Sequence, residues 1–301
     1  MASGYHPGEL AAQRRAGLRA EADRVGGIVR TDVPPTAAAF LTEQRMLVIG
    51  GADERGRMWS SLLTGEPGFL RAGTVGGAAA IDIAARPQAG DPLADALTRR
   101  TRIGAIALDP ATRRRMRING IAEPTGTGLR LTAEQVYANC PKYIQRRELV
   151  SARAGGGAPT TTVSTELAEA DRRMITEADT FFIVSTSADG HRDASHRGGN
   201  PGFVRLAADG GLSWPDYPGN AMMMTLGNLA QSPLAGLLFL DWATGTTLQL
   251  TGAARTDWAG PRWCRFHLTE ARRTELASPL SWTEPEYSRF NPVPDTPLLA
   301  S

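Results

Sequence analysis

Three consecutive side chains, Ser195, His196 and Arg197, place a hydroxyl, an imidazole and a guanidinium where a strand is predicted to end. The glycines Gly198 and Gly199 follow and let the backbone bend there. A guanidinium offers a planar fork of donors that suits phosphate oxygens, and the serine can donate a further hydrogen bond. The pattern therefore predicts an anion site. The alternative is a strand-end arginine in a surface salt bridge.

A second candidate anion site is the segment 218–220, which precedes a helix predicted over residues 222–231. The N-terminus of a helix presents unpaired N–H groups and a partial positive charge, both of which favour a phosphate. Asn220 is the expected N-cap residue of this helix, which also carries Thr225 and Asn228.

Lys142 is the only lysine in a chain with 33 basic residues, and it lies in the polar stretch 139–147 (NCPKYIQRR). This stretch is read either as part of a site or as the solvated end of a helix. Arg113, Arg115 and Arg117 alternate along one face of a predicted strand, which forms either an anion-binding stripe or a face exposed to water.

Composition excludes several classes of protein. With 301 residues, 42% hydrophobic residues and a net charge of +2, the chain is an ordinary globular protein without the basic excess of a nucleic-acid binder. Two cysteines and four scattered histidines indicate no disulfide framework and no metal site. No apolar run reaches the length of a membrane span or a signal peptide, so a cytoplasmic protein is expected.

Two stretches of the chain repeat. Residues 56–71 align with 190–205 at an offset of 134, and residues 103–122 align with 235–254 at an offset of 132. A fixed period indicates two similar supersecondary units in one chain. The copies diverge where charge matters, since His196 and Arg197 align with Leu62 and Leu63.

Short predicted strands with turn signals at regular spacing favour barrels over a parallel sheet. The fold class is therefore expected to be mainly β with flanking helices (α+β), with two barrels in tandem. The expected units are residues 1–150 (N-terminal helices and a degenerate barrel ending in a helix over 132–147), a linker at 151–164, a second barrel at 165–277 with the site, and an extended Pro-rich tail at 278–301.

Several motifs in this order resemble the pyridoxamine 5′-phosphate oxidase-like family of FMN-binding split barrels, in particular its tandem subgroup. The resemblance implies two tandem split β-barrels that form a pseudo-dimer. Its landmarks extend to about residue 258. They are 6–9 (HPGE), 63–69 (LTGEPGF), 112–120 (TRRRMRING), 139–147 (NCPKYIQRR), 195–204 (SHRGGNPGFV) and 219–228 (GNAMMMTLGN).

The resemblance implies FMN as cofactor, bound where two barrels meet. Its implied neighbours in the second half are Ser195, His196, Arg197, Gly198, Trp214, Asp216, Asn220, Thr225 and Asn228. Those implied in the first half are Lys142, Tyr143 and Gln145. His196 is the candidate for moving a proton.

The expected function is an FMN-dependent oxidoreductase that acts on a small molecule, with electrons from a separate reductase or from NAD(P)H. The alternative is a non-catalytic split barrel that binds flavin, haem or a deazaflavin. The sequence leaves open the substrate and whether the fused pair forms a homodimer.

Overall fold

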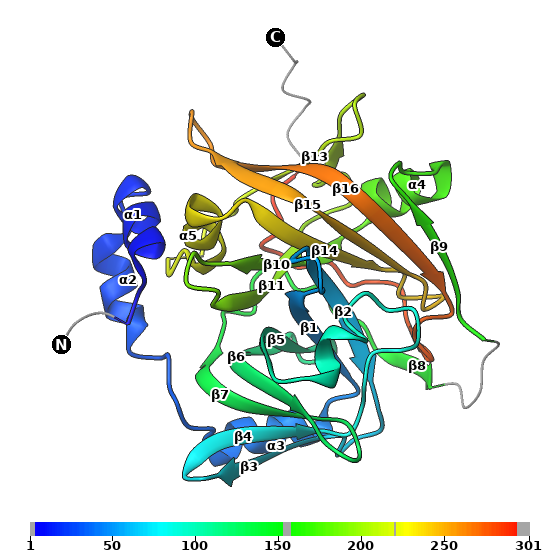
Figure 1. The fold of residues 1–301 in the computed structure, drawn as a ribbon. Helices are drawn as coiled ribbons and strands as arrows, with labels where there is room; N and C mark the ends of the chain where they lie inside the picture. Colours follow the sequence, from blue (N-terminus) through cyan, green and yellow to red (C-terminus); the bar gives the residue numbers. More distant parts are fainter. Residues whose placement is uncertain (1–3, 153–157, 220, 294–301) are drawn as a thin grey trace.

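The computed structural model describes residues 4–152, 158–219 and 221–293. Two large antiparallel sheets dominate it, and a few short helices lie at their edges (Figure 1). The mainly β architecture with flanking helices predicted from the sequence is confirmed. Among the described residues, no helix is long and apolar enough to cross a membrane.

The two sheets have the same strand order. Across the first sheet the strands are β2 (Met58–Thr64), β1 (Met46–Ala52), β5 (Thr101–Asp109), β6 (Arg114–Pro124), β7 (Leu129–Ala138), β4 (Ala78–Ile83) and β3 (Leu70–Val75). Across the second they are β11 (Arg192–Gly198), β10 (Thr180–Thr186), β14 (Leu234–Leu240), β15 (Thr247–Asp257), β16 (Trp263–Glu275), β13 (Leu212–Pro215) and β12 (Arg205–Leu206), and β9 (Thr160–Ser164) pairs with β16. Each strand of the first sheet therefore has a counterpart in the second, and β9 is an additional strand.

A β-bulge falls at the same place in both sheets. It precedes Gly120 in β6 and Gly252 in β15, two residues that the repeat offset of 132 matches. A Cβ on Gly120 would lie 2.0 Å from the carbonyl oxygen of Thr132, and one on Gly252 would lie 2.0 Å from that of His267. Only glycine fits so close to another backbone. The sequence repeat therefore corresponds to strands with the same register.

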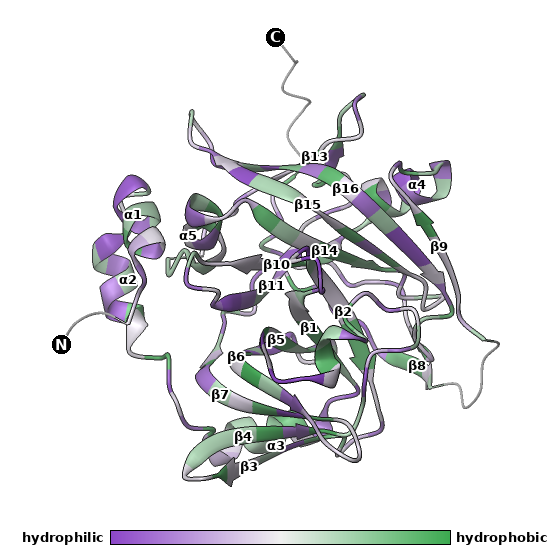
Figure 2. Cartoon of the chain, in the orientation of Figure 1, coloured by the Kyte–Doolittle hydropathy of each residue, from purple (hydrophilic) through white to green (hydrophobic). Residues whose placement is uncertain are grey.

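The sheets pack against each other through reciprocal contacts. A Cβ on Gly104 of β5 would lie 2.6 Å from the amide nitrogen of Ala194 on β11, and one on Gly236 of β14 would lie 2.7 Å from the carbonyl oxygen of Met58 on β2. A buried apolar cluster fills the space around these contacts, with side chains from both sheets. Figure 2 shows apolar colour on the central strands and hydrophilic colour over much of the N-terminal helices.

The helices cover the margins of the sheets. They are α1 (Pro7–Arg15), α2 (Arg19–Gly26), α3 (Pro35–Glu43), α4 (Glu169–Glu177), α5 (Met224–Gln231) and the 3-10 turn η1 (Ala96–Thr98). Gly17 takes a left-handed φ of 70° after α1 and so separates it from α2. α1 packs on α5 of the second half (Figure 1).

The helix expected over 132–147 is wrong, since this stretch continues strand β7 and then turns into a loop. Leu129, Leu131 and Ala133 are buried while the residues between them are half-buried, which is the alternation of a strand. Pairing with β6 and β4 overrides the helix-like capping pattern at Thr132.

The segments expected as a linker and a tail contain paired strands. β8 (Leu149–Ala152) ends within residues 151–164, and β9 occupies 160–164. β17 (Leu280–Trp282) lies in the Pro-rich stretch and pairs with β8, so the described part of the C-terminal stretch packs onto the end of the first half. Polar, Gly- and Pro-rich composition indicated irregular structure, but unpaired strand edges were available to both segments.

Candidate functional site

A cationic pocket lies between the two halves, beside the end of β11. We use this name for the cavity whose lining includes His196 and Arg197 from the second half, Arg115, Lys142 and Tyr143 from the first, and the acidic residue Asp216. The sequence pattern around residues 195–198 and the polar stretch 139–147 thus meet in space, although they lie far apart in the sequence. Sheet packing brings them together, because β11 contacts both β5 and β6 of the first half.

The tautomer of His196 follows from its contact with Arg115. Nη1 of Arg115 donates to Nδ1 of His196 at 2.8 Å, so the imidazole proton must lie on Nε2. This Nε2 is buried and has no partner among the described residues. Burial and the charges of Arg115, Arg197 and Arg117 lower the pKa of His196 well below its usual 6.5. His196 is therefore a neutral hydrogen-bond donor, which does not suit the proton-handling role expected of it.

Ser195 is fully buried and lies between two guanidiniums. Nη2 of Arg117 and Nη1 of Arg197 both donate to its Oγ, the latter at 3.3 Å. Since the oxygen accepts two hydrogen bonds, its own proton is available for donation. No described residue is recorded as its acceptor. Ser195 is therefore one more donor, next to Arg197, which lines the pocket.

The donors of the pocket outnumber its acceptors. Nε of Arg115, Nε and Nη2 of Arg197 and Nε of Arg117 are buried without a partner among the described residues. Such groups are rare in folded proteins, and each one costs about 1–3 kcal/mol when it is left unpaired. Acceptor oxygens from outside the chain would satisfy them.

The charge of the pocket is also uncompensated. Arg117 forms an ion pair with Asp193 at 3.4 Å, but no carboxylate of the described residues lies within ion-pair distance of Arg115, Arg197 or Lys142. Burial and repulsion between the guanidiniums lower the pKa of Arg115 to about 9. Arginine nevertheless stays protonated in proteins, so this repulsion is a cost that a bound anion would remove.

A wider compartment of about 350 Å³ adjoins the pocket. The two share part of their lining, and the shared residues are Phe203, Pro215, Asp216, Tyr217 and Pro218. Asp216 adds no free negative charge here, because Nε of Arg262 donates to its Oδ2 at 3.0 Å. The combined cavity has a cationic inner end and an outer part with aromatic and proline side chains, which suits an elongated ligand with one anionic end.

Gly198 and Tyr143 form a very close contact between the halves. A Cβ on Gly198 would lie 2.0 Å from the carbonyl oxygen of Tyr143, so no other residue fits at this position. Tyr143 itself has a φ of 67°, and its hydroxyl donates to the carbonyl oxygen of Pro218 at 2.7 Å. The stretch 139–147 is thereby fixed against the second half and forms one wall of the pocket.

Other residues implied by the resemblance have structural positions outside the pocket. Trp214 is completely buried and packs edge-on against Phe181 at 5.1 Å in the core of the second half. Gln145 is buried as well, and its Nε2 donates to the carbonyl oxygens of Tyr143 and Gly199 at 3.1 Å. Gln145 therefore holds the wall in place rather than lining the cavity. Asn220 lies outside the described residues, and α5 begins later, after Met223.

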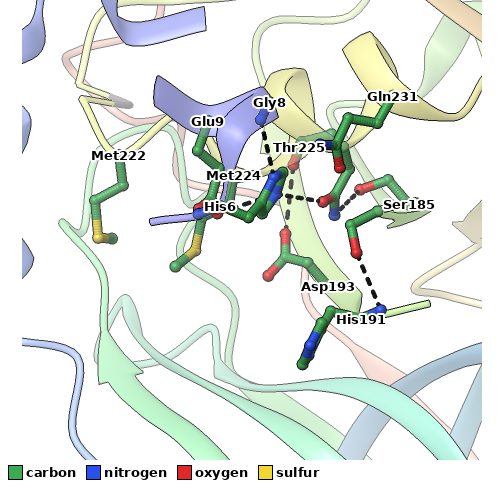
Figure 3. A network of polar contacts seen from close by, with 12 residues as sticks. His6, Gly8, Glu9, Ser185, His191, Asp193, Met222, Met224, Thr225 and Gln231 are labelled. Atoms are coloured by element: carbon green, nitrogen blue, oxygen red, sulfur yellow. Dashed lines mark hydrogen bonds and ion pairs between the residues drawn. The ribbon is translucent and has the colours of Figure 1, made fainter. Parts of the chain in front are cut away.

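Thr225 and Asn228 belong to a polar network around α1 and α5 that is linked to the site through the ion pair of Asp193 with Arg117; Figure 3 shows Thr225 and Asp193 in it. Nε2 of His6 lies 2.9 Å from Oδ1 of Asn228, and Oγ1 of Thr225 donates to Asp193 at 3.5 Å. The backbone N–H of His6 donates to Glu9 at 2.8 Å, which closes a capping box on α1. Burial raises the pKa of Glu9 to about 8. The network thus anchors the N-terminal HPGE motif to the second half.

Arg115 and Arg117 are the site residues that sequence reasoning did not single out. They were noted only as part of an arginine stripe that a solvent-exposed face would equally explain. In the structure β6 is central in its sheet, and its consecutive residues 116–120 are buried, so neither face is exposed to water there. Only the packing of β11 on β6 shows that this face is turned towards the second half and not towards water.

No family model and no curated protein matches this chain. Solved structures match it partially, with TM-scores below 0.3. HupZ of Group A Streptococcus is 12% identical (TM-score 0.28; 34% of this chain and 94% of that one). An FAD-binding protein of Mycobacterium smegmatis is 15% identical, with a TM-score of 0.26 over 38% of this chain and 98% of that one. A pyridoxinephosphate oxidase-family protein of Clostridium acetobutylicum is 11% identical, with a TM-score of 0.25 over 38% of this chain and 90% of that one. Likeness at this level supports neither the fold nor the function by itself.

Proposed function

We propose that this chain is a flavin-dependent oxidoreductase that holds FMN by its phosphate in the cationic pocket. The observation that carries the proposal is the set of buried donors on Arg115, Arg197 and His196 that have no acceptor among the described residues. A phosphate monoester supplies several acceptor oxygens and up to two negative charges, which matches three uncompensated cations. The adjoining compartment gives room for the rest of the ligand.

The architecture supports a pseudo-dimer of two split barrels fused into one chain. Equal strand order, the matching bulges and the reciprocal glycine contacts are what two copies related by an approximate twofold axis would show. In this arrangement the pocket takes one wall from each half, as a site between two subunits would.

In the proposed mechanism the bound flavin supplies the redox chemistry. The residues of the chain bind and orient. Arg115, Arg197 and Lys142 neutralise the anionic end, while Ser195 and Nε2 of His196 donate single hydrogen bonds to it. Tyr143 fixes the wall between the halves and limits the access of water. Electrons would come from NAD(P)H or from a separate reductase, and a small molecule would be the substrate.

A titration with FMN and riboflavin tests the proposal, because riboflavin lacks the phosphate. The wild-type protein should prefer FMN, and Arg197→Leu, which installs the residue found at the matching position Leu63, should lose this preference. A hydrogen bond to a charged group contributes about 1.5–3 kcal/mol, so FMN should bind roughly 10- to 100-fold more weakly. Arg114→Ala is the control, since this exposed side chain lies over Phe40 outside the pocket.

Absence of flavin binding, or an FMN preference that survives Arg197→Leu, would remove the proposal. Anaerobic addition of NAD(P)H to the FMN complex then separates an enzyme from a carrier. Loss of the flavin's visible absorbance, followed by its return in air, supports turnover. A complex that keeps its colour with every electron donor supports the non-catalytic alternative.

A further inference from the structure

The first half contains a counterpart of the cationic pocket, at the place that the strand correspondence predicts. A small cavity there is lined by Leu62, Asp91, Thr247, Gln249 and Ala277, among others. The repeat offsets match Leu62 with His196 and Thr247 with Arg115. An imidazole and a guanidinium are thus replaced by uncharged side chains.

The inner hydrogen bond of the two sites is the same. In the first half Nε2 of Gln249 donates to Oγ of Ser61 at 3.1 Å. In the second half Nη2 of Arg117 donates to Oγ of Ser195. The offsets of 132 and 134 match these residues pairwise. Each serine therefore accepts a hydrogen bond from a side chain of the other half, and the two donors occupy matching positions of the repeat.

The two serines differ in what accepts their protons. Oγ of Ser61 donates to Oδ1 of Asp91 at 2.7 Å, and Gln249 donates to Oδ2 of the same carboxylate at 3.1 Å. The backbone N–H of Leu93 donates to Oδ1 at 2.8 Å as a third contact. In the second half the corresponding stretch after Gly219 carries no acidic side chain, and Ser195 has no recorded acceptor among the described residues.

We propose that the first half retains the serine and its side-chain donor from the anion site but not the cations, and that the carboxylate of Asp91 closes this remnant from within, so that the chain binds one anionic ligand and not two. Asp91 takes the place of a ligand's anionic group, because its carboxylate accepts hydrogen bonds from both Ser61 and Gln249. The same comparison assigns the ligand's anionic group in the second half to the side of Ser195 that faces Arg197, whose Nε and Nη2 have no partner among the described residues. The proposed function enters only through the identity of that ligand.

Rescue by acetate tests this inference without any flavin. Asp91→Ala removes the carboxylate and leaves Ser61 and Gln249 as donors, so acetate should bind there and raise the melting temperature of this variant by several degrees relative to chloride at equal ionic strength. Asp91→Asn is the matched control, because its amide fills the same volume as the carboxylate. Acetate should raise the melting temperatures of this variant and of the wild type by no more than its general salt effect. Adding Ser61→Ala to Asp91→Ala should abolish the rescue.

Equal shifts for Asp91→Ala, Asp91→Asn and the wild type would overturn the inference. If Asp91→Ala does not fold in chloride, the yield of refolding with and without acetate becomes the readout, and a yield that acetate leaves unchanged overturns the inference equally. The wild-type protein should bind one FMN per chain, and two per chain would contradict a closed first site. Loss of all flavin binding would count against the proposed function alone, because the acetate measurement involves no flavin.

Discussion

At the scale of single residues, His196 gives a pH dependence with a defined sign. Its folded-state pKa lies well below 6.5 while the unfolded chain titrates near 6.5, so its contribution to stability is complete above pH 6.5 and is lost as the pH falls below it. Relative to His196→Leu, the residue type of the matching position, the wild-type free energy of unfolding should fall by up to about 1.4 kcal/mol per pH unit below 6.5. Urea unfolding in buffers free of phosphate measures this. If the free energies of unfolding of the wild type and of His196→Leu change in parallel with pH, the imidazole is not held neutral.

At the scale of elements, the contact of α1 with α5 depends on two glycines. A Cβ on Gly8 would lie 2.3 Å from the carbonyl oxygen of Gly227, a backbone atom that cannot move aside. Gly8→Ala should therefore destabilise the protein by about 1–3 kcal/mol, as overpacking does. Gly27→Ala is the control, and its melting temperature in thermal unfolding should equal that of the wild type, since nothing lies within 4 Å of a Cβ at Gly27. Equal stability of both variants would mean that α1 is not docked as described.

At the scale of the whole molecule, the two halves should unfold together. One apolar cluster joins both sheets, and it contains Val48 and Ile106 from the first and Phe182 and Leu238 from the second, each at most 1% exposed. Unfolding one half alone would expose this surface on the other, which favours a cooperative transition. Differential scanning calorimetry should show a single transition. Two well-separated transitions would show that the halves are independently stable domains.

Local patterns in the sequence determined much of this protein. The repeat offsets of 134 and 132 predicted which strands match, and the strand and turn signals predicted a mainly β chain. The group Ser195, His196 and Arg197 was recognised because its three side chains are consecutive, and the same pocket holds Lys142. Such features depend on neighbours in the chain or on a fixed period, which a sequence displays directly.

Only the tertiary structure decided which faces meet. Arg115 and Arg117 became site residues because β11 packs on their strand, whereas Trp214 was placed in the core and Thr225 in the network under α1. The same packing puts Asp91 beside Ser61, thirty positions away. Alternation along a strand shows that two faces exist, but what covers each face depends on residues distant in the sequence. For that reason the sequence indicated an anion site, and the packing of the two halves determined its walls and its closed counterpart.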